Sequence, residues 1–413
     1  MCLAQEFEKQ NSRLYVVGGY CRNFLLGLPS SDIDICGSLK GDEVKEICGR
    51  LNFDCVVVNK KLGTLLISHA SDRFEYTTFR EENYPKGGDH SPQKVEFVTD
   101  LFVDAKRRDF TINCIYYDIL ADKFVDPYGG RCDVKKRVVK CVETPEFVFS
   151  SDGLRILRLV RFSCQLGFKI SRKTFKVARE QSVLLKDISA ERISKELKEI
   201  VVADYKYGSK RRDTIRYINK LHILRHIFKL SYDLKLKNKG YINKFFECEK
   251  ELRYETFLML ILLQYFNYDY TNFNNLTFAV NRLYGNDGIK CGIDLQTLAR
   301  TYDFVQKYLF CPHTQMLFAE YHNLKGNEKN IANVFCDKVY LSQGVLALKQ
   351  RNVPLNEKDL KISNETLLKN VDNKNISKIR QQLFFECFCG GVANDGDALL
   401  SRAIEIDKSS KTK

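Results

Sequence analysis

The chain has 413 residues, of which 66 are basic and 52 acidic, so that its formal net charge is +14. Hydrophobic residues make up 44% of the chain and charged residues 29%, a composition that excludes fibrous and disordered classes. The longest apolar run, residues 257–263, is too short to span a bilayer, and the first ten residues lack the apolar stretch of a signal peptide. The length predicts two or three domains, and we expect no membrane association.

The positive charge is confined to one part of the chain. Residues 1–140 hold 21 basic and 21 acidic side chains, whereas residues 141–413 hold 45 basic and 31 acidic side chains. A basic region of this kind is typical of a polyanion-binding surface, but a solvated lysine-rich surface has the same composition. Composition alone leaves both interpretations open.

The pattern of apolar residues in the sequence changes near residue 140. Before it, short runs rich in β-branched and aromatic residues alternate with turn residues, and we predict strands there. After about residue 145, apolar residues recur at helical spacing, as in Ile193, Leu197 and Ile200. The pattern predicts an α+β head with a mixed β-sheet, followed by an all-α remainder. The predicted strands are residues 14–17, 33–35, 55–58, 64–68, 73–78, 94–98 and 111–118.

Fifteen cysteines and six histidines show no metal-site pattern. The number of cysteines is odd, and no pair has the C-x2-C spacing of a zinc site. The histidines form no H-E-x-x-H motif. We therefore expect no zinc, and reduced thiols in a cytoplasmic protein.

The stretch YVVGGYCRNFLLGLPSSDIDI, residues 15–35, contains the first chemical motif. Gly18 and Gly19 end a predicted strand, where the backbone can approach a ligand, and Arg22 follows in the first helical turn, within reach of a phosphate. Asp32 and Asp34 lie two residues apart on the next predicted strand and therefore share one face. Adjacent carboxylates repel one another, and binding of Mg²⁺ would relieve this repulsion in the manner of a phosphoryl-transfer site.

A second motif lies on a predicted helix. Arg155, Arg158 and Arg161 follow at three-residue intervals, which spreads them over about 120° of one helix face. Asp152 precedes Arg155 by three residues, so the two side chains are expected to hold each other's orientation. A carboxylate beside a guanidinium matches the donor and acceptor edge of cytosine or adenine, but not that of uracil or guanine.

Together with DAKRRDFTINCIYYD (104–118), DPYGG (126–130) and SDGLRILRLVRFSCQLGF (151–168), these motifs resemble the class II tRNA nucleotidyltransferase and bacterial poly(A) polymerase family, within the polymerase β-like superfamily. The resemblance covers about residues 12–200 and includes the order of the motifs. It implies a catalytic head over 1–140, a helical neck for nucleotide recognition over 141–205, and a helical tRNA-binding body and tail over 206–413.

The resemblance also implies roles for individual residues. Asp32 and Asp34 match metal-binding aspartates, and Glu75, on a predicted strand, is expected beside them as a third catalytic carboxylate. Asp109 and Asn113 match supporting positions, and ERISKEL (191–197) matches a segment that braces the neck. The predicted nucleotide-binding residues are Gly18, Gly19, Arg22, Arg108, Asp152, Arg155, Arg158 and Arg161.

The activity implied is the addition of C, C and A to the 3′ end of tRNA from CTP and ATP, with Mg²⁺ and without a nucleic-acid template. One position departs from the family pattern, because Ser151 stands where the family has glutamate; serine there is also a good helix N-cap. A poly(A) polymerase, an A-adding or CC-adding enzyme, and an inactive RNA-binding protein remain alternatives. The polar segment 81–93 has the composition of a mobile loop that could reshape the nucleotide pocket.

Overall fold

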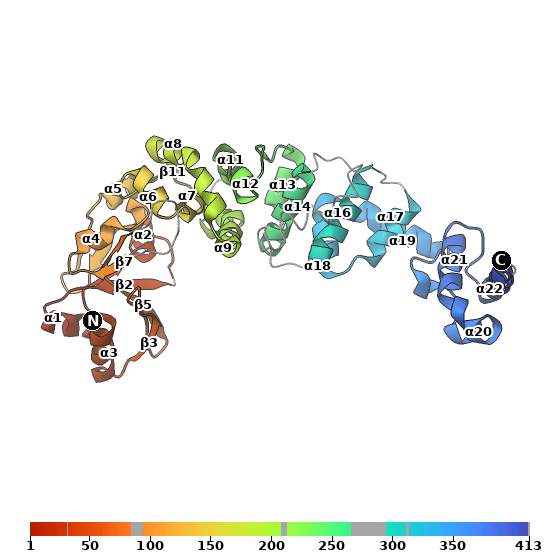
Figure 1. Ribbon diagram of the computed structural model, residues 1–413, viewed down its shortest axis with the longest axis horizontal. Coiled ribbons are helices and arrows are strands. Elements are labelled where there is room, and N and C mark those ends of the chain that lie inside the picture. Colours follow the sequence, from red (N-terminus) through yellow and green to blue (C-terminus); the bar gives the residue numbers. More distant parts are fainter. Residues whose placement is uncertain (31, 84–93, 208–212, 266–294, 311–313, 412–413) are drawn as a thin grey trace. The chain divides into compact units, whose positions relative to one another are not determined.

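The structure is a computed structural model that describes residues 1–30, 32–83, 94–207, 213–265, 295–310 and 314–411. The described residues fall into two compact units, one up to Lys237 and one from Asn238 onward. The first unit contains every strand of the described chain, and the second is built from helices (Figure 1). The predicted functional boundaries at residues 140 and 205 both lie within the first unit, and they remain predictions.

The centre of the first unit is a seven-stranded mixed sheet with the strand order β3-β4-β5-β2-β1-β8-β9. Neighbouring strands run antiparallel, except that β2 and β5 are parallel. A two-stranded ribbon of β6 and β7 accompanies it. The strands are β1 (Leu14–Val17), β2 (Ile33–Gly37), β3 (Asp54–Asn59), β4 (Thr64–His69), β5 (Asp72–Thr78), β6 (Arg80–Asn83), β7 (Lys94–Phe97), β8 (Tyr116–Asp118) and β9 (Lys123–Val125).

The two faces of the sheet have different cores. Helices α1 (Cys2–Lys9) and α3 (Gly41–Arg50) cover one face, where Phe7 and Ile47 pack against Ile35 of β2 (Figure 1). The other face packs against α4 (Leu101–Lys106) and includes Cys36 of β2. Because side chains alternate along a strand, Asp34 belongs to the face of Cys36, away from α1 and α3.

Helices and short connections make up the rest of the first unit. Within this region α7 and α9 pack against each other, and Ile156, Leu159 and Leu197 are fully buried. Burial of each such side chain contributes about 1.5–3 kcal/mol. The helices are α2 (Gly19–Leu26), α5 (Gly130–Lys136), α6 (Pro145–Ser151), α7 (Leu154–Leu166), α8 (Arg172–Glu180), α9 (Ala190–Val201), α10 (Ala203–Tyr207), α11 (Asp213–Lys220) and α12 (Ile223–Ile227), with the short paired strands β10 (Val138–Val139) and β11 (Lys169–Ile170).

The second unit has its own buried core. The apolar run 257–263 lies in α14 (Arg253–Tyr265) and is completely buried, which explains its composition. In the parts of the chain that the structure describes, no helix has the length and apolarity needed to cross a membrane. The other helices are α13 (Lys239–Glu247), α16 (Leu295–Phe310), α17 (Gln315–Asn323), α18 (Gly326–Phe335), α19 (Lys338–Gln350), α20 (Asn364–Asn370), α21 (Ile376–Phe388) and α22 (Gly396–Lys411).

Most of the predicted strands are confirmed, with one partial error. Residues 111–113 form a 3₁₀ turn, η1 (Thr111–Asn113), and only 116–118 of the predicted strand 111–118 are extended. The strand pattern also missed α1 and α3, whose apolar residues are few because only one face of each is buried. Every cysteine in the described ranges is a free thiol, as expected. Of the predicted mobile segment, residues 84–93 lie outside the described residues.

Candidate active site

The predicted metal site lies at the start of β2. Asp34 is paired in register with Glu75 of the parallel strand β5 and with Val17 of β1, so that the carboxylates of Asp34 and Glu75 share one face of the sheet. Loss of hydration raises the pKa of Asp34, and the negative charges of Glu75 and Asp32 raise it further. The structure therefore brings the three predicted carboxylates into one electronegative cluster.

This cluster fits a hard divalent cation, because its donors are carboxylate oxygens whose mutual repulsion a cation relieves. Asp32, Asp34 and Glu75 are all exposed, so a cation could reach each of them. Within the described ranges, no group of three or more His, Cys, Asp or Glu side chains has the geometry of a metal site. The candidate protein ligands are therefore two carboxylates, Asp32 and Asp34, at the start of β2. Glu75 lies beside them as a further negative charge.

The glycine turn lies directly beside Asp34. Gly18 has φ of +78°, a conformation that favours glycine, and a Cβ atom there would be 3.4 Å from Oδ2 of Asp34. Gly19 is the first residue of α2, and Gly18 is its N-cap. The sequence motif therefore places the open N-terminus of a helix next to the aspartate, as predicted.

Arg22 begins a buried polar network. Its Nη1 donates to Oδ1 of Asn113 at 2.5 Å, and Nδ2 of Asn113 donates to Oδ1 of Asp109 at 3.2 Å. Arg158 completes the network, since its Nε donates to Oδ2 of Asp109 at 2.8 Å. Burial lowers the pKa of Arg22 to about 10, so the guanidinium stays charged at neutral pH. Asp109 and Asn113 thus connect two of the predicted nucleotide-binding arginines.

The three arginines of α7 do not share one environment. Arg155 and Arg158 line the cavity described below, but Arg161 does not; its Nε donates to Oε2 of Glu196 at 2.8 Å. Its guanidinium carbon lies 4.5 Å from the centroid of the Phe162 ring. Six residues of helix rotate Arg161 about 120° from Arg155, and this rotation directs it to α9 instead.

Asp152 and Arg155 are held by partners that differ from the expected ones. Arg155 donates to the carbonyl oxygens of Arg107 at 2.7 Å and Val148 at 3.3 Å. Oδ1 of Asp152 accepts from the backbone N–H of Leu154 at 3.0 Å, and Oδ2 accepts from Nη2 of Arg192 at 2.8 Å. Sequence spacing placed the two residues in the same site, but their orientation comes from elements remote in sequence.

The expected N-cap role of Ser151 is wrong. Ser151 is the last residue of α6, and its hydroxyl donates to the carbonyl oxygen of Phe147 at 2.8 Å. Asp152, not Ser151, accepts the N–H at the start of α7. The serine is buried and its hydroxyl is directed into its own helix, so it does not replace the family's glutamate.

A Ser151→Ala substitution should therefore not affect the nucleotide choice that the family resemblance implies. The substitution removes one hydrogen bond to a helix carbonyl, which costs about 1 kcal/mol of stability. We expect a slightly lower unfolding midpoint in urea and an unchanged ratio of CTP to ATP affinity. A change of more than about threefold in that ratio, equivalent to ~0.7 kcal/mol, would show that Ser151 contributes to base selection.

Arg108 is positioned by a buried carboxylate. Its Nη2 lies 3.2 Å from Oδ2 of Asp104, and its Nε donates to the hydroxyl of Tyr116 at 2.9 Å. Arg107 binds the other oxygen of Asp104 at 2.7 Å. Although burial alone raises the pKa of Asp104, the two arginines lower it to about 2. Asp104 is consequently ionised at every physiological pH and fixes both guanidinium groups.

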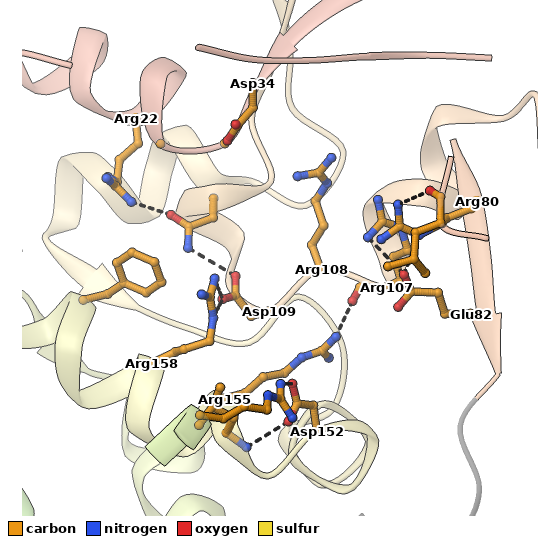
Figure 2. A pocket seen from close by; sticks show the side chains of 17 residues that line it. Arg22, Asp34, Arg80, Glu82, Arg107, Arg108, Asp109, Asp152, Arg155 and Arg158 are labelled. Atoms are coloured by element: carbon orange, nitrogen blue, oxygen red, sulfur yellow. Dashed lines mark hydrogen bonds and ion pairs between the residues drawn. The ribbon is translucent and has the colours of Figure 1, made fainter. Parts of the chain in front are cut away.

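A cavity of about 540 Å³ brings most of these residues together. Figure 2 shows Arg22 and Asp34 on one side of it, Asp152 and Arg155 on the opposite side, and Arg108 between them. Of the predicted site residues, Asp32, Glu75 and Arg161 are not among those lining it. The lining consists of Gly18, Gly19, Arg22, Asp34, Leu62, Arg80, Glu82, Arg107, Arg108, Asp109, Asn113, Asp152, Leu154, Arg155, Arg158, Phe162 and Arg192.

Seven lining residues were not predicted to belong to the site, and two of them, Leu62 and Leu154, are apolar. Arg80 and Glu82 come from β6, and Arg107 binds Glu82 and Asp104. Phe162 contacts the guanidinium groups of Arg22 and Arg158 with its ring. Arg192 reaches the cavity from α9. Arg107, Phe162 and Arg192 lie in segments quoted from the sequence, but no role was assigned to them there.

Two family models match separate parts of the first unit. Residues 14–140 match the family described as the poly A polymerase head domain. Residues 167–231, which follow the head domain, match a family described as the probable RNA and SrmB-binding site of polymerase A.

Curated relatives of the chain carry the name CCA-adding enzyme. The protein from Staphylococcus epidermidis is 35% identical over 204 residues, which are 49% of this chain and 49% of that protein. The protein from Ligilactobacillus salivarius is 37% identical over 191 residues, 46% of each chain. The matched part of the chain thus spans about half the length of these curated relatives.

Solved structures resemble the whole chain in fold. An apo CCA-adding enzyme has a TM-score of 0.68 at 19% identity, covering 98% of this chain and 94% of that one. The Thermotoga maritima CCA-adding enzyme complexed with tRNA has a TM-score of 0.64 at 18% identity, covering 98% and 93%. The head domain and the helices that follow it therefore have the fold of these structures.

Proposed function

We propose that this chain is a tRNA nucleotidyltransferase that adds C, C and A to the tRNA 3′ end from CTP and ATP. The observation that carries the proposal is the single cavity lined by both Asp34 and the pair Asp152 and Arg155. Carboxylate chemistry for phosphoryl transfer and a donor and acceptor pair for a base edge are thus available to one bound nucleotide. The names of the curated relatives support the same activity.

Base choice rests on Asp152 and Arg155. An ionised aspartate only accepts hydrogen bonds, and arginine only donates them. Two of the five N–H donors of Arg155 are used by the carbonyls of Arg107 and Val148, and the others are left for a ligand. Cytosine offers an amino donor next to a ring-nitrogen acceptor, and so does adenine; uracil and guanine offer a carbonyl where the amino group would be.

The triphosphate is bound by arginines fixed before it arrives. Arg22 and Arg158 are tied through Asn113 and Asp109, and Arg108 is tied to Asp104. Guanidinium groups held in this way neutralise phosphate oxygens without further ordering of their side chains. The open N-terminus of α2 at Gly19 adds backbone N–H groups beside them.

In the proposed reaction, the 3′-hydroxyl oxygen of the tRNA forms a bond to the α-phosphorus of the nucleotide. The bond from that phosphorus to the pyrophosphate oxygen breaks, and the hydroxyl proton is released. Asp32 and Asp34 would hold Mg²⁺, which supplies charge neutralisation to the attacking and leaving oxygens when bound. The remaining residues bind and orient: Asp152 and Arg155 the base, and the arginines the phosphates.

The basic part of the chain is the proposed tRNA-binding region. The whole net charge of +14 lies beyond residue 140. Residues 167–231 match a probable RNA-binding family. Double-stranded RNA is bound mainly through its phosphates and shape, which suits a basic surface. A tRNA substrate together with free thiols favours the cytoplasm as its location.

The test is incorporation into tRNA that lacks its last three nucleotides, with CTP, ATP or both supplied. We expect addition of two C with CTP alone, and addition of C, C and A with both. Ser151 motivates the alternatives of partial or A-only addition: CC addition would stop after two C even with both nucleotides, and A-only addition would give A with ATP alone. Failure to release pyrophosphate with any nucleotide and divalent cation would instead identify a binding protein.

A further inference from the structure

Arg192 is remote in sequence from Asp152 but contacts it in the cavity. Nη2 of Arg192 donates to Oδ2 of Asp152 at 2.8 Å, and the side chains are 37% and 15% exposed. Its backbone is anchored at the start of α9, where the side chain of Ser189 accepts from the N–H of Arg192. The arginine therefore approaches Asp152 from a helix that the base-recognition motif does not include.

We propose that Arg192 is a specificity-determining residue that selects the base by fixing the carboxylate of Asp152. This inference rests on the proposed function and extends it to a residue outside the aspartate–arginine motif. Arg192 acts through Asp152 and is a positioning residue, with one further donor available to the nucleotide itself.

The need for such a residue follows from Ser151. Its hydroxyl is bonded to the carbonyl of Phe147, and Arg155 is held by backbone carbonyls. Each oxygen of Asp152 accepts a hydrogen bond, Oδ1 from the N–H of Leu154 and Oδ2 from Arg192. With both oxygens bound, the plane of the carboxylate is fixed before a nucleotide enters.

The bond from Arg192 fixes where the carboxylate of Asp152 presents its acceptor oxygens. A carboxylate accepts hydrogen bonds and donates none. Each oxygen keeps acceptor capacity beyond the bond already made. A fixed ionised carboxylate accepts from the amino group of cytosine or adenine, and it repels the carbonyl oxygen that uracil or guanine presents. Removing Arg192 frees the carboxylate to turn and weakens this discrimination.

The other terminal nitrogen of the Arg192 guanidinium, Nη1, makes no hydrogen bond to a described residue. Nη1 is buried, although Arg192 lines the cavity. A buried donor left unpaired costs about 1–3 kcal/mol, so an acceptor supplied by the ligand is favoured there. The nucleotide is the ligand for which the cavity has the matching groups.

The experiment measures equilibrium binding of CTP and of UTP to the full chain and its variants. With Arg192→Met, CTP affinity should fall about tenfold while UTP affinity changes less than about twofold, because only CTP uses the fixed acceptor. Arg192→Lys keeps the charge but not the planar fork, and we expect an intermediate loss. Lys195→Met is the matched control, since it removes a cation from an exposed position of the same helix. The ratio of CTP to UTP affinity in this control should equal that of the unchanged chain.

A double variant separates positioning from a general structural effect. If Arg192 acts through Asp152, adding Arg192→Met to Asp152→Asn should change the preference for CTP over UTP by less than about twofold. An unchanged preference in Arg192→Met, or equal losses for both nucleotides, would overturn the proposal. Binding is read without turnover, so a chain that adds no nucleotide would refute the proposed function and still decide the role of Arg192.

Discussion

An Asp34→Asn variant is expected to incorporate CMP and AMP at least about a thousandfold more slowly than the unchanged chain, while it binds tRNA equally well. The expected loss corresponds to several kcal/mol of charge stabilisation at the reacting phosphate. Asparagine has the shape of aspartate but lacks the charge that a divalent cation requires. The measurement is single-nucleotide incorporation, with tRNA binding followed separately.

The Asp34→Asn variant should still fold, so that a loss of nucleotide incorporation can be attributed to the missing charge. The pKa of Asp34 is raised, chiefly by loss of hydration and further by Glu75 and Asp32, so its negative charge opposes folding at neutral pH. An uncharged asparagine should therefore leave the free energy of unfolding the same or slightly higher. Asp72→Asn, an exposed position on β5, is the control and should retain full activity. Normal incorporation by Asp34→Asn would remove Asp34 from the catalytic site.

The part of the site that depends on neighbours in sequence was predictable. Gly18, Gly19 and Arg22 follow one another through a strand end and a helix start, and the alternation of a strand placed Asp32 and Asp34 on one face. These relations are set by backbone geometry that is the same in every protein. The predicted residues therefore meet at the N-terminus of α2 and the start of β2.

The part that depends on tertiary contacts was not predictable. Spacing suggested that Asp152 and Arg155 hold each other, but their bonds go to Arg192 and to the carbonyl of Arg107. Spacing also grouped Arg161 with the cavity, whereas Glu196 on α9 binds it. A helical interval fixes the direction of a side chain only relative to its own helix, and the neighbouring helix decides which partner it meets.

Asp104 shows the same limit for a residue that no pattern singled out. It is completely buried, and its two oxygens bind Arg107 and Arg108 on either side. The hydroxyl of Tyr116 donates to it at 3.0 Å. In the sequence it is only the first residue of the segment 104–118, but in the fold it orients two cavity arginines.

An Asp104→Asn variant should lose about 3–5 kcal/mol of stability, because it removes the buried carboxylate that Arg107 and Arg108 share, and among the described residues only Arg107 keeps a second carboxylate partner, Glu82. Arg108 lines the cavity, so triphosphate binding should weaken as well. The free energy of unfolding in urea at pH 7 measures the first effect. Asp54→Asn, at an exposed position on β3, should change stability by less than about 0.5 kcal/mol. A loss no larger than that control would mean that Asp104 is not the counter-charge of the arginines.

The pH dependence of this loss follows from the low pKa of Asp104. Arg107 and Arg108 outweigh burial and lower it to about 2 from an ordinary value of 3.8. The ionised carboxylate therefore stabilises the fold fully above about pH 4 and loses this contribution as the pH falls towards 2. The difference in unfolding free energy between the unchanged chain and Asp104→Asn should be constant from pH 7 to 5 and shrink by about 2 kcal/mol between pH 4 and 2. A difference that stays constant to pH 2 would show that the stabilisation does not come from the charge of Asp104.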